Sequence, residues 1–519
     1  MSTSPTDLGT PRTAQGQQGL GAAAARGALM MLTGQGMRVL LQFASLVALA
    51  RLLSPQDYGL VAAVFVVIGI GEIFRDFGLS SAAIRSPKLT RAQSTNLFWI
   101  NSAIGLALGV GLFSLATPLA ELFGQVEIVG IARAMSIIFL FNGITTQFRA
   151  LLVRALRFRW LATVDVLAPA IALGVALTAA LLGAGYWSLV FQHVTQSLVL
   201  LTGAALGARV IPGLPRRNVS MHSFLVFGAN TVMTQLVNYA ANRLDTAVIG
   251  FAHGATQLGL YNRAQQLVVA PASQVQAPAT SVALPVLTRL QNDPARFDAF
   301  LIRGQLAFGY PIALTMACVA AAAEPIIQIM LGDQWLAAVP LLQLLALAVI
   351  ARNLAFVGSW VYMVRGLSGD LLRFTAATAI APVAGVLIGA HWGMIGVATG
   401  VALAPWTTWP ISLWWLSRVT PVPVRALFGG ALRISLVAFL VFGAASAVAH
   451  LLPPLPALGS LVVHAGTIAV TLGLLCIVPV LRADARVFRD IAVLLIRRRT
   501  RRSNARAADS DSSTSATLR

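Results

Sequence analysis

Long apolar stretches, each about twenty residues or more and long enough to cross a bilayer, recur along most of the chain. They predict about fourteen membrane-spanning helices separated by short polar connections. The predicted helices cover approximately 28–53, 58–84, 94–120, 127–154, 160–183, 186–208, 219–251, 257–288, 298–329, 336–364, 370–389, 393–418, 425–451 and 457–481. Several of these stretches exceed the minimum span, so we expect some helices to tilt or to project from the membrane.

Basic residues are concentrated in alternate connections. The connections near 121–127, 183–186, 329–335 and 452–457 contain no Lys or Arg. The connections that alternate with them contain Arg85, Lys88, Arg91, Arg154, Arg157, Arg159, Arg209, Arg216, Arg217, Arg289, Arg296, Arg365, Arg373, Arg418 and Arg425. Because basic loops stay in the cytoplasm, both termini are expected there, and the number of spans is expected to be even.

Composition supports the membrane assignment and narrows the function. Of the 519 residues, 57% are hydrophobic and only 10% are charged, which excludes an ordinary soluble protein. The net charge is +20, but the arginines lie in the short connections and no nucleic-acid-binding motif is present, so we expect no nucleic-acid partner.

The chain shows no pattern of catalytic or metal-ligating residues. Cys318 and Cys476 lie inside apolar stretches, where cysteine usually acts as a small buried hydrophobe. No Cys/His cluster has metal-ligand spacing, and no phosphate-binding loop, HExxH or GxSxG sequence occurs. The short connections also leave little room for an aqueous catalytic domain. We therefore expect no enzymatic activity, no cofactor and no metal.

An internal repeat relates the first predicted helix to the seventh at a constant offset. The matched pairs are Gln35 with Gln235, Arg38 with Asn238, Gln42 with Asn242, Ser45 with Asp245, and Gly59-Leu60 with Gly259-Leu260. A copy with an even number of spans inserts in the same orientation as the first. Parallel repeats of this kind are typical of transporters.

The repeat predicts a division of the chain into five parts. Residues 1–27 are expected to form a disordered cytoplasmic arm, and 28–208 an N-terminal lobe of six helices. Residues 209–420 are expected to form a C-terminal lobe of six helices, and 421–482 an additional pair. Residues 483–519 are expected to form a basic cytoplasmic tail.

The matched polar residues are spaced by three or four, so they share one face of each helix. An unpaired polar group in hydrocarbon costs several kcal/mol, so these faces must contact other helices or a water-filled cleft. Hydrogen bonds between helices would satisfy the same groups, but a stripe repeated in both halves favours the cleft. The candidate cleft residues are Gln35, Arg38, Gln42, Gln235, Asn238, Asn242, Arg243 and Arg263. Their basic character suits an anionic ligand such as a pyrophosphate headgroup.

Carboxylates within the predicted spans allow more than one role. Asp245 is a candidate for ion coupling, and a fixed ion pair with an arginine of the cleft explains it equally well. Glu72, Arg75 and Asp76 have the spacing of a local ion cluster, which is either structural or part of a gate.

Several segments resemble the Wzx-type oligosaccharide flippases, and the WzxC-like exporters of lipopolysaccharide and exopolysaccharide in particular. These segments are ARLLSPQDYGLVAAV, FRDFGLSSAAIRSPKLTRAQSTNLFWIN, GAGYWSLV, LGLYNRAQQLVVAPASQVQAPATSVALPVLTRL and LGDQWLAAVPLLQLLALA. The resemblance covers roughly 28–420 and implies an all-helical protein of the multidrug/oligosaccharidyl-lipid/polysaccharide (MOP) exporter superfamily. In that fold, two six-helix lobes face each other in a V.

The resemblance also implies a function. Such proteins move undecaprenyl-pyrophosphate-linked repeat units from the cytoplasmic to the periplasmic leaflet of the inner membrane by alternating access. The expected partners are this lipid-linked oligosaccharide, membrane lipids, and polysaccharide polymerase or assembly proteins. Members typically have twelve helices, and the pair predicted after residue 420 either forms a lipid-side groove, as in lipid II flippases, or packs peripherally. A lipid II flippase, a MATE-like ion-coupled antiporter and a non-transport scaffold are the alternatives.

Overall fold

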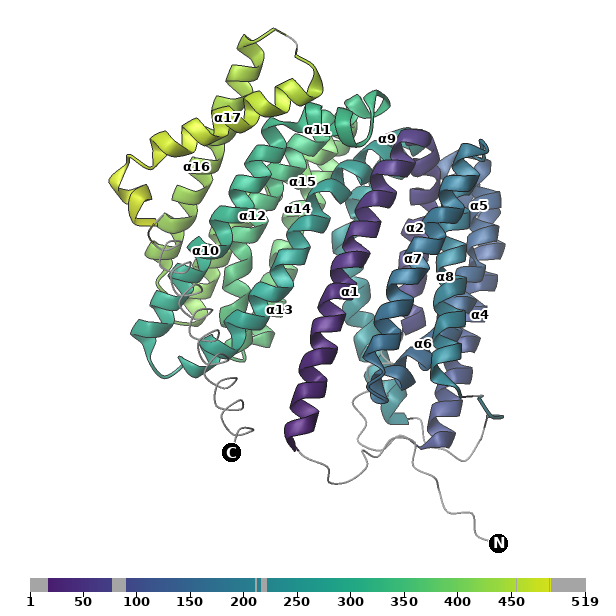
Figure 1. Cartoon of the computed structure of the whole chain (residues 1–519). Helices are drawn as coiled ribbons and strands as arrows, with labels where there is room; N and C mark the ends of the chain where they lie inside the picture. Colours follow the sequence, from purple (N-terminus) through teal and green to yellow (C-terminus); the bar gives the residue numbers. More distant parts are fainter. Residues whose placement is uncertain are drawn as a thin grey trace, which may run out of the picture. The chain divides into compact units, whose positions relative to one another are not determined.

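The computed structural model describes residues 17–76, 90–210, 212–215, 222–453, 455–484 and 486, and the regular secondary structure of these residues is entirely helical (Figure 1). Within this part of the chain, ten helical segments are long and apolar enough to cross a membrane, from Pro55–Arg75 to Ala457–Leu475. The prediction of an all-α, multi-pass membrane protein is confirmed.

The helices follow the predicted order, and most of their bounds agree with the prediction within a few residues. They are α1 (Gln17–Leu52), α2 (Pro55–Asp76), α4 (Arg91–Phe123), α5 (Glu127–Met135), α6 (Ile137–Arg154), α7 (Phe158–Leu181), α8 (Trp187–Ala208), α9 (His222–Arg289), α10 (Pro294–Ala321), α11 (Ala323–Met330), η1 (Asp333–Ala338), α12 (Val339–Val364), α13 (Ser368–Thr378), α14 (Ile380–Gly389), η2 (Ala390–Trp392), α15 (Gly393–Val419), α16 (Val424–Leu451) and α17 (Ala457–Leu475).

Several helices differ from the prediction in where they begin or are interrupted. The predicted helices 298–329 and 370–389 are interrupted at Ala322 and at Ala379. Helix α1 begins at Gln17, inside the segment 1–27 that was expected to be a disordered arm. The run of alanines before Arg26 explains the extension, because alanine has the highest helix propensity. The predicted helix 127–154 is interrupted at Ser136, where α5 gives way to α6.

Helix α9 contains the seventh and eighth predicted helices. Its backbone leaves the helical conformation at Gly254, with φ +81° and ψ 177°. L-residues other than glycine rarely adopt such a φ, so a glycine is needed at this turn. The break lies between the predicted helices 219–251 and 257–288.

The chain forms two compact units, which are described separately. Unit 1 contains Met1–Arg263, Ile327–Ala338 and Val386–Val397, and unit 2 contains the remaining segments. In unit 1, α7 packs against α1 and α8, and α6 packs against α4 and α8. In unit 2, α10 packs against α12 and α16, and α17 packs against α16.

Small residues allow close helix contacts in unit 1. A Cβ added to Gly105 of α4 would lie 2.5 Å from the carbonyl oxygen of Phe139 on α6. A Cβ added to Gly143 of α6 would lie 2.6 Å from the carbonyl oxygen of Asn101. Because lipid is as apolar as a protein interior, such close contact is a main source of helix association in membranes.

The internal repeat has a counterpart in the packing of unit 1. A Cβ added to Gly59 would lie 1.6 Å from the carbonyl oxygen of Ala255. A Cβ added to the matching Gly259 would lie 1.9 Å from the carbonyl oxygen of Pro55. The two contacts are related by the same sequence offset as the repeat. The start of α2 and the second part of α9 therefore cross at equivalent glycines.

Candidate functional site

A cavity of about 410 Å³ lies among α1, α2, α6, α7 and α8 of unit 1. The side chains of three arginines and one aspartate line it, so its charge is predominantly positive. The lining residues are Arg38, Arg75, Asn142, Thr145, Thr146, Arg149, Ala150, Val153, Asp165, Pro169, Gln196 and Leu200. We take this arginine cavity as the candidate functional site.

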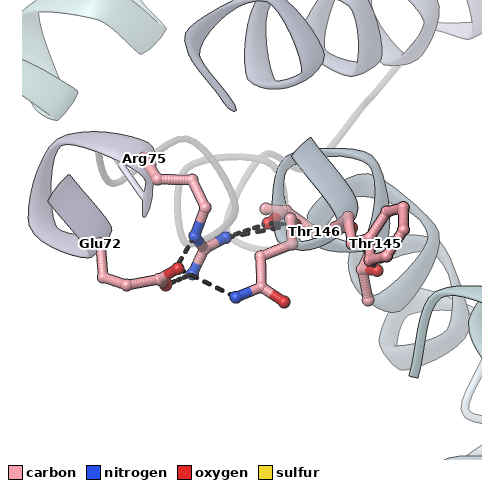
Figure 2. Close-up of polar contacts among 6 residues, drawn as sticks. Glu72, Arg75, Thr145 and Thr146 are labelled. Atoms are coloured by element: carbon pink, nitrogen blue, oxygen red, sulfur yellow. Dashed lines mark hydrogen bonds and ion pairs between the residues drawn. The ribbon is translucent and has the colours of Figure 1, made fainter. Parts of the chain in front are cut away.

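Arg75 is fixed in the cavity by contacts with α2 and α6. Its Nε and Nη2 atoms each lie 2.7 Å from Oε2 of Glu72, one turn earlier on α2. Figure 2 shows the guanidinium of Arg75 between Glu72 and Thr146, whose Oγ1 accepts a hydrogen bond of 2.5 Å. Asn142 Nδ2 donates to the other oxygen of Glu72 at 2.9 Å. Glu72 and Arg75 thus form the ion pair that their spacing predicts, whereas the side chain of Asp76 lies outside the described residues.

Arg149 and Asp165 form a second ion pair in the cavity, between α6 and α7. Arg149 Nη1 donates to Asp165 Oδ1 at 2.6 Å, and Nη2 donates to Oδ2 at 3.1 Å. The side chains are 35% and 24% exposed. Neither Arg149 nor Asp165 was among the candidate residues predicted from the sequence. The sequence feature that could have predicted this pair is the presence of two opposite charges on consecutive predicted spans, each inside an apolar stretch.

Arg38 brings the third guanidinium to the cavity, from the polar face of α1. Among the described residues, no carboxylate forms a salt bridge with it. Gln35 and Gln42, on the same predicted stripe, are exposed and do not line the cavity. Ser45 instead accepts a hydrogen bond of 2.7 Å from Gln192 on α8, an interhelical bond of the kind that the alternative explanation of the stripe requires.

The predicted residues of the seventh and eighth helices whose side chains are described do not line this cavity. Gln235 is half-buried and Arg243 is exposed, and neither lines it. The side chains of Asn238 and Asn242 lie outside the described residues. Among the predicted cleft residues whose side chains are described, Arg38 alone lines the cavity, and Arg75 of the predicted ion cluster lines it too.

Arg263 lies on an aromatic surface instead. Its Cζ atom is 3.7 Å from the centroid of the Tyr58 ring, a cation–π contact. The Tyr58 ring meets the ring of Trp335 edge-on at 5.5 Å. Both aromatic side chains are buried, with exposed fractions of 3% and 0%. This arrangement serves packing, so a role for Arg263 in binding stays a prediction.

The carboxylate of Asp245 is buried and accepts hydrogen bonds from Tyr261 and Thr246. It accepts hydrogen bonds from Tyr261 Oη at 2.5 Å and from the backbone N–H of Thr246 at 2.7 Å. The Thr246 hydroxyl adds a third at 3.2 Å. These bonds stabilise a buried carboxylate, and both explanations of Asp245, ion coupling and a fixed ion pair, stay predictions.

The conspicuous LGDQW segment caps the end of α1. Gln334 Nε2 donates to the carbonyl oxygens of Ala50 at 2.8 Å and Leu53 at 3.2 Å. Trp335 Nε1 also donates to Ala50 O, at 2.8 Å. In return, the Arg51 guanidinium donates to the carbonyl oxygen of Ile329. The last carbonyls of a helix have no partner within the helix, and these side chains supply one.

A family model described as "Polysaccharide biosynthesis protein" matches residues 48–340. The chain belongs to this family. The match extends over more than half of the chain and includes the break in α9, the LGDQW segment and every residue that lines the arginine cavity except Arg38. The family membership expected from the sequence is thereby confirmed.

Curated relatives have related names. The succinoglycan biosynthesis transport protein ExoT of Rhizobium meliloti is 29% identical over 59% of this chain and 62% of its own length. The lipopolysaccharide biosynthesis protein WzxC of Escherichia coli is 24% identical over 68% and 73%. The teichuronic acid biosynthesis protein TuaB of Bacillus subtilis is 27% identical over 62% and 68%. The chain thus spans less than two thirds of the succinoglycan protein.

Solved structures confirm the fold. The lipid II flippase MurJ in an inward closed conformation aligns with a TM-score of 0.66 at 16% identity, over 86% of this chain and 99% of MurJ. An inward-facing MATE multidrug transporter of the MOP superfamily aligns with a TM-score of 0.58, over 78% and 99%. At this identity the likeness concerns the fold alone, which is the MOP transporter fold.

Proposed function

We propose that this protein is a flippase for undecaprenyl-pyrophosphate-linked oligosaccharides in lipopolysaccharide or exopolysaccharide biosynthesis. The observation that carries the proposal is the arginine cavity in a multi-pass protein of the polysaccharide biosynthesis family. The named relatives act in succinoglycan transport and in lipopolysaccharide and teichuronic acid biosynthesis, which supports a lipid-linked saccharide as the substrate class.

The cavity suits the headgroup of such a substrate. A pyrophosphate is a compact anion with several acceptor oxygens, and guanidinium groups bind phosphate oxygens with two parallel hydrogen bonds. Arg38, Arg75 and Arg149 point such donors into one volume. Asn142, Thr145 and Gln196 add neutral polar groups for the first sugar. The prenyl chain stays in the lipid, where its burial costs nothing.

Transport then follows from alternating access of the site to the two leaflets. In this proposal the protein lies in the bacterial inner membrane with both termini in the cytoplasm, and residues 28–208 and 209–420 form the two lobes. The substrate moves from the cytoplasmic to the periplasmic leaflet. Asp245 is the proposed coupling residue, and polysaccharide polymerase or assembly proteins are the proposed partners.

Two other transport functions are alternatives to this proposal. A lipid II flippase shares the pyrophosphate headgroup, and the MurJ alignment together with α16 and α17 favours it as the second candidate. A MATE-like antiporter of cationic drugs needs an acidic or aromatic site, which the arginine cavity is not. The names of the curated relatives favour the oligosaccharide.

The decisive experiment is complementation of a strain that lacks the gene. We expect the strain to accumulate lipid-linked oligosaccharide on the cytoplasmic side, and the wild-type gene to restore export. Arg38→Ala combined with Arg75→Ala should fail to restore it, at equal membrane abundance. Arg373→Ala is the matched control, because Arg373 is 78% exposed and lies outside the cavity. Full export by the double variant would contradict the proposed site, and trapped peptidoglycan precursor would identify the second candidate as correct.

A further inference from the structure

The two ion pairs of the arginine cavity differ in their surroundings. Arg75 has hydrogen bonds to Thr146 Oγ1 and Asn142 O in addition to its pair with Glu72. The hydrogen bonds of Arg149 and Asp165 run only between their own two side chains, as far as the described residues show. Arg75 is therefore held by a network, whereas Arg149 depends on a single partner.

Asp165 occupies the position on Arg149 that a phosphate group can take. A guanidinium presents two parallel N–H donors, and a carboxylate and a phosphate both accept them with two oxygens. With 35% and 24% of the side chains exposed, the pair is accessible from the cavity. A phosphate that enters the cavity can thus replace Asp165 on Arg149 without any movement of Arg149.

The pair also links two helices that otherwise share few contacts. Helix α6 packs mainly on α4 and α8, and α7 mainly on α1 and α8, whereas direct contacts between α6 and α7 are few. The Arg149–Asp165 pair spans this weak contact.

Helix α7 is also weakened next to Asp165. Pro169 follows Asp165 by one helical turn and has no N–H, so the carbonyl of Asp165 lacks its donor within the helix. Helices bend most readily at such positions. Helix α7 also packs against α1, which carries Arg38.

We propose that Asp165 is a built-in competitor of the headgroup phosphate. Binding of the diphosphate transfers Arg149 from Asp165 to the ligand and so opens the link between α6 and α7. Only hydrogen bonds and ion contacts are exchanged in this step. The inference rests on the proposed function and adds to it a residue that sets the affinity for substrate and couples binding to a helix movement.

Binding to the purified full-length protein tests the proposal. The probes are inorganic pyrophosphate and farnesyl diphosphate, and their binding is measured by titration calorimetry in detergent. Asp165→Asn removes the competing charge, and we expect it to bind both probes about tenfold more tightly, the effect of losing one charge-assisted pair. Asp165→Glu keeps the carboxylate and should bind within about threefold of the wild type, well below the tenfold that one pair is worth.

Two further variants separate competition from a general effect of charge. Arg149→Ala should weaken binding, and Asp165→Asn should have no further effect in that background, because the two residues then act through one interaction. Asp370→Asn is the matched control, since Asp370 pairs with Arg373 on α13 and lies outside the cavity. It should bind both probes like the wild type.

The outcomes are distinguishable. If the wild type binds diphosphate and Asp165→Asn binds no more tightly, the inference is wrong and the proposed function stands. If the tightening persists in the Arg149→Ala background, Asp165 acts through general charge and the inference is wrong. If the wild type binds neither probe, the proposed function fails and the inference fails with it. Tighter binding of farnesyl diphosphate than of pyrophosphate would identify the lipid carrier, and equal binding would identify the diphosphate alone, as the recognised chemistry.

Discussion

Unit 1 contains two polar regions that lie along α1 and are built in opposite ways. Around Arg38, charged side chains line an open volume, and the ion pairs there remain partly exposed. Around Ala50, the polar atoms of Gln334 and Trp335 end on backbone carbonyls, and the surrounding aromatic rings are buried. The first region can exchange its partners with a ligand, because water and solute reach it. In the second, the polar side-chain atoms of Gln334 and Trp335 are paired with backbone carbonyls, and these bonds hold the helices together.

The largest loss of stability is expected from Trp335→Ala, which changes the region around Ala50. Trp335 is fully buried, stacks edge-on with Tyr58 and caps α1, so its loss leaves a large void. Truncation of a buried aromatic residue costs about 3 to 5 kcal/mol. Thermal unfolding in detergent should show a large decrease in melting temperature, whereas Trp392→Ala, at a side chain that is 72% exposed, should show little. Equal stability of the two variants would mean that the capped region does not hold the helices.

The next largest loss of stability is expected from Gly59→Ala. The added Cβ would overlap the carbonyl oxygen of Ala255, so the backbones must move apart. Overpacking of this kind costs about 1 to 3 kcal/mol. Gly36→Ala is the matched control on α1, since nothing lies within 4 Å of its added Cβ. The control should be neutral or slightly stabilising in the same unfolding assay, because alanine favours a helix more than glycine does. A control that loses as much stability as Gly59→Ala would contradict the contact with Ala255 as the cause.

A smaller effect is expected from Glu72→Gln. The change removes the charge that holds Arg75 but keeps the shape of the side chain, and the bonds of Arg75 to α6 persist. We expect a loss of about 0.5 to 1.5 kcal/mol, the net value of a typical hydrogen bond, because the glutamine side chain still offers an acceptor. Comparison of unfolding at low and high salt checks the cause, because the loss should shrink as salt screens the pair.

The smallest effect on stability is expected from Asp165→Asn. The pair is partly exposed and has no supporting network, and such pairs contribute about 0 to 1 kcal/mol. The melting temperature should therefore change less for Asp165→Asn than for Glu72→Gln. The affinity for diphosphate should change more for Asp165→Asn than for Glu72→Gln. A larger loss of stability for Asp165→Asn than for Glu72→Gln would mean that Arg149–Asp165, and not Glu72–Arg75, is the ion pair that holds the helices together.

The sequence was sufficient to locate the helices and part of the site. Apolar length predicts the spans, the break at Gly254 lies between two of them, and helical spacing predicts the Glu72–Arg75 pair. Arg38 was singled out because a charge inside a span is costly without a function. These features depend on local sequence alone.

The rest of the cavity depends on how helices rotate against each other. Arg149 and Asp165 lie on separate helices, and no sequence pattern in either span indicates that the helix faces that carry them contact each other. The same limit explains Gln35 and Gln42, which share the predicted face with Arg38 but are exposed outside the cavity. A helical stripe predicts a common face and leaves open what that face contacts.

The paired glycines at 59 and 259 have a consequence for how this chain can change over generations. Each glycine makes room for the backbone beside the other, so a larger residue in one copy disturbs the contact that both copies share. No substitution in the second copy can restore that room, because the obstructing atoms belong to the main chain. At this crossing, both halves of the duplicated sequence are therefore expected to keep glycine.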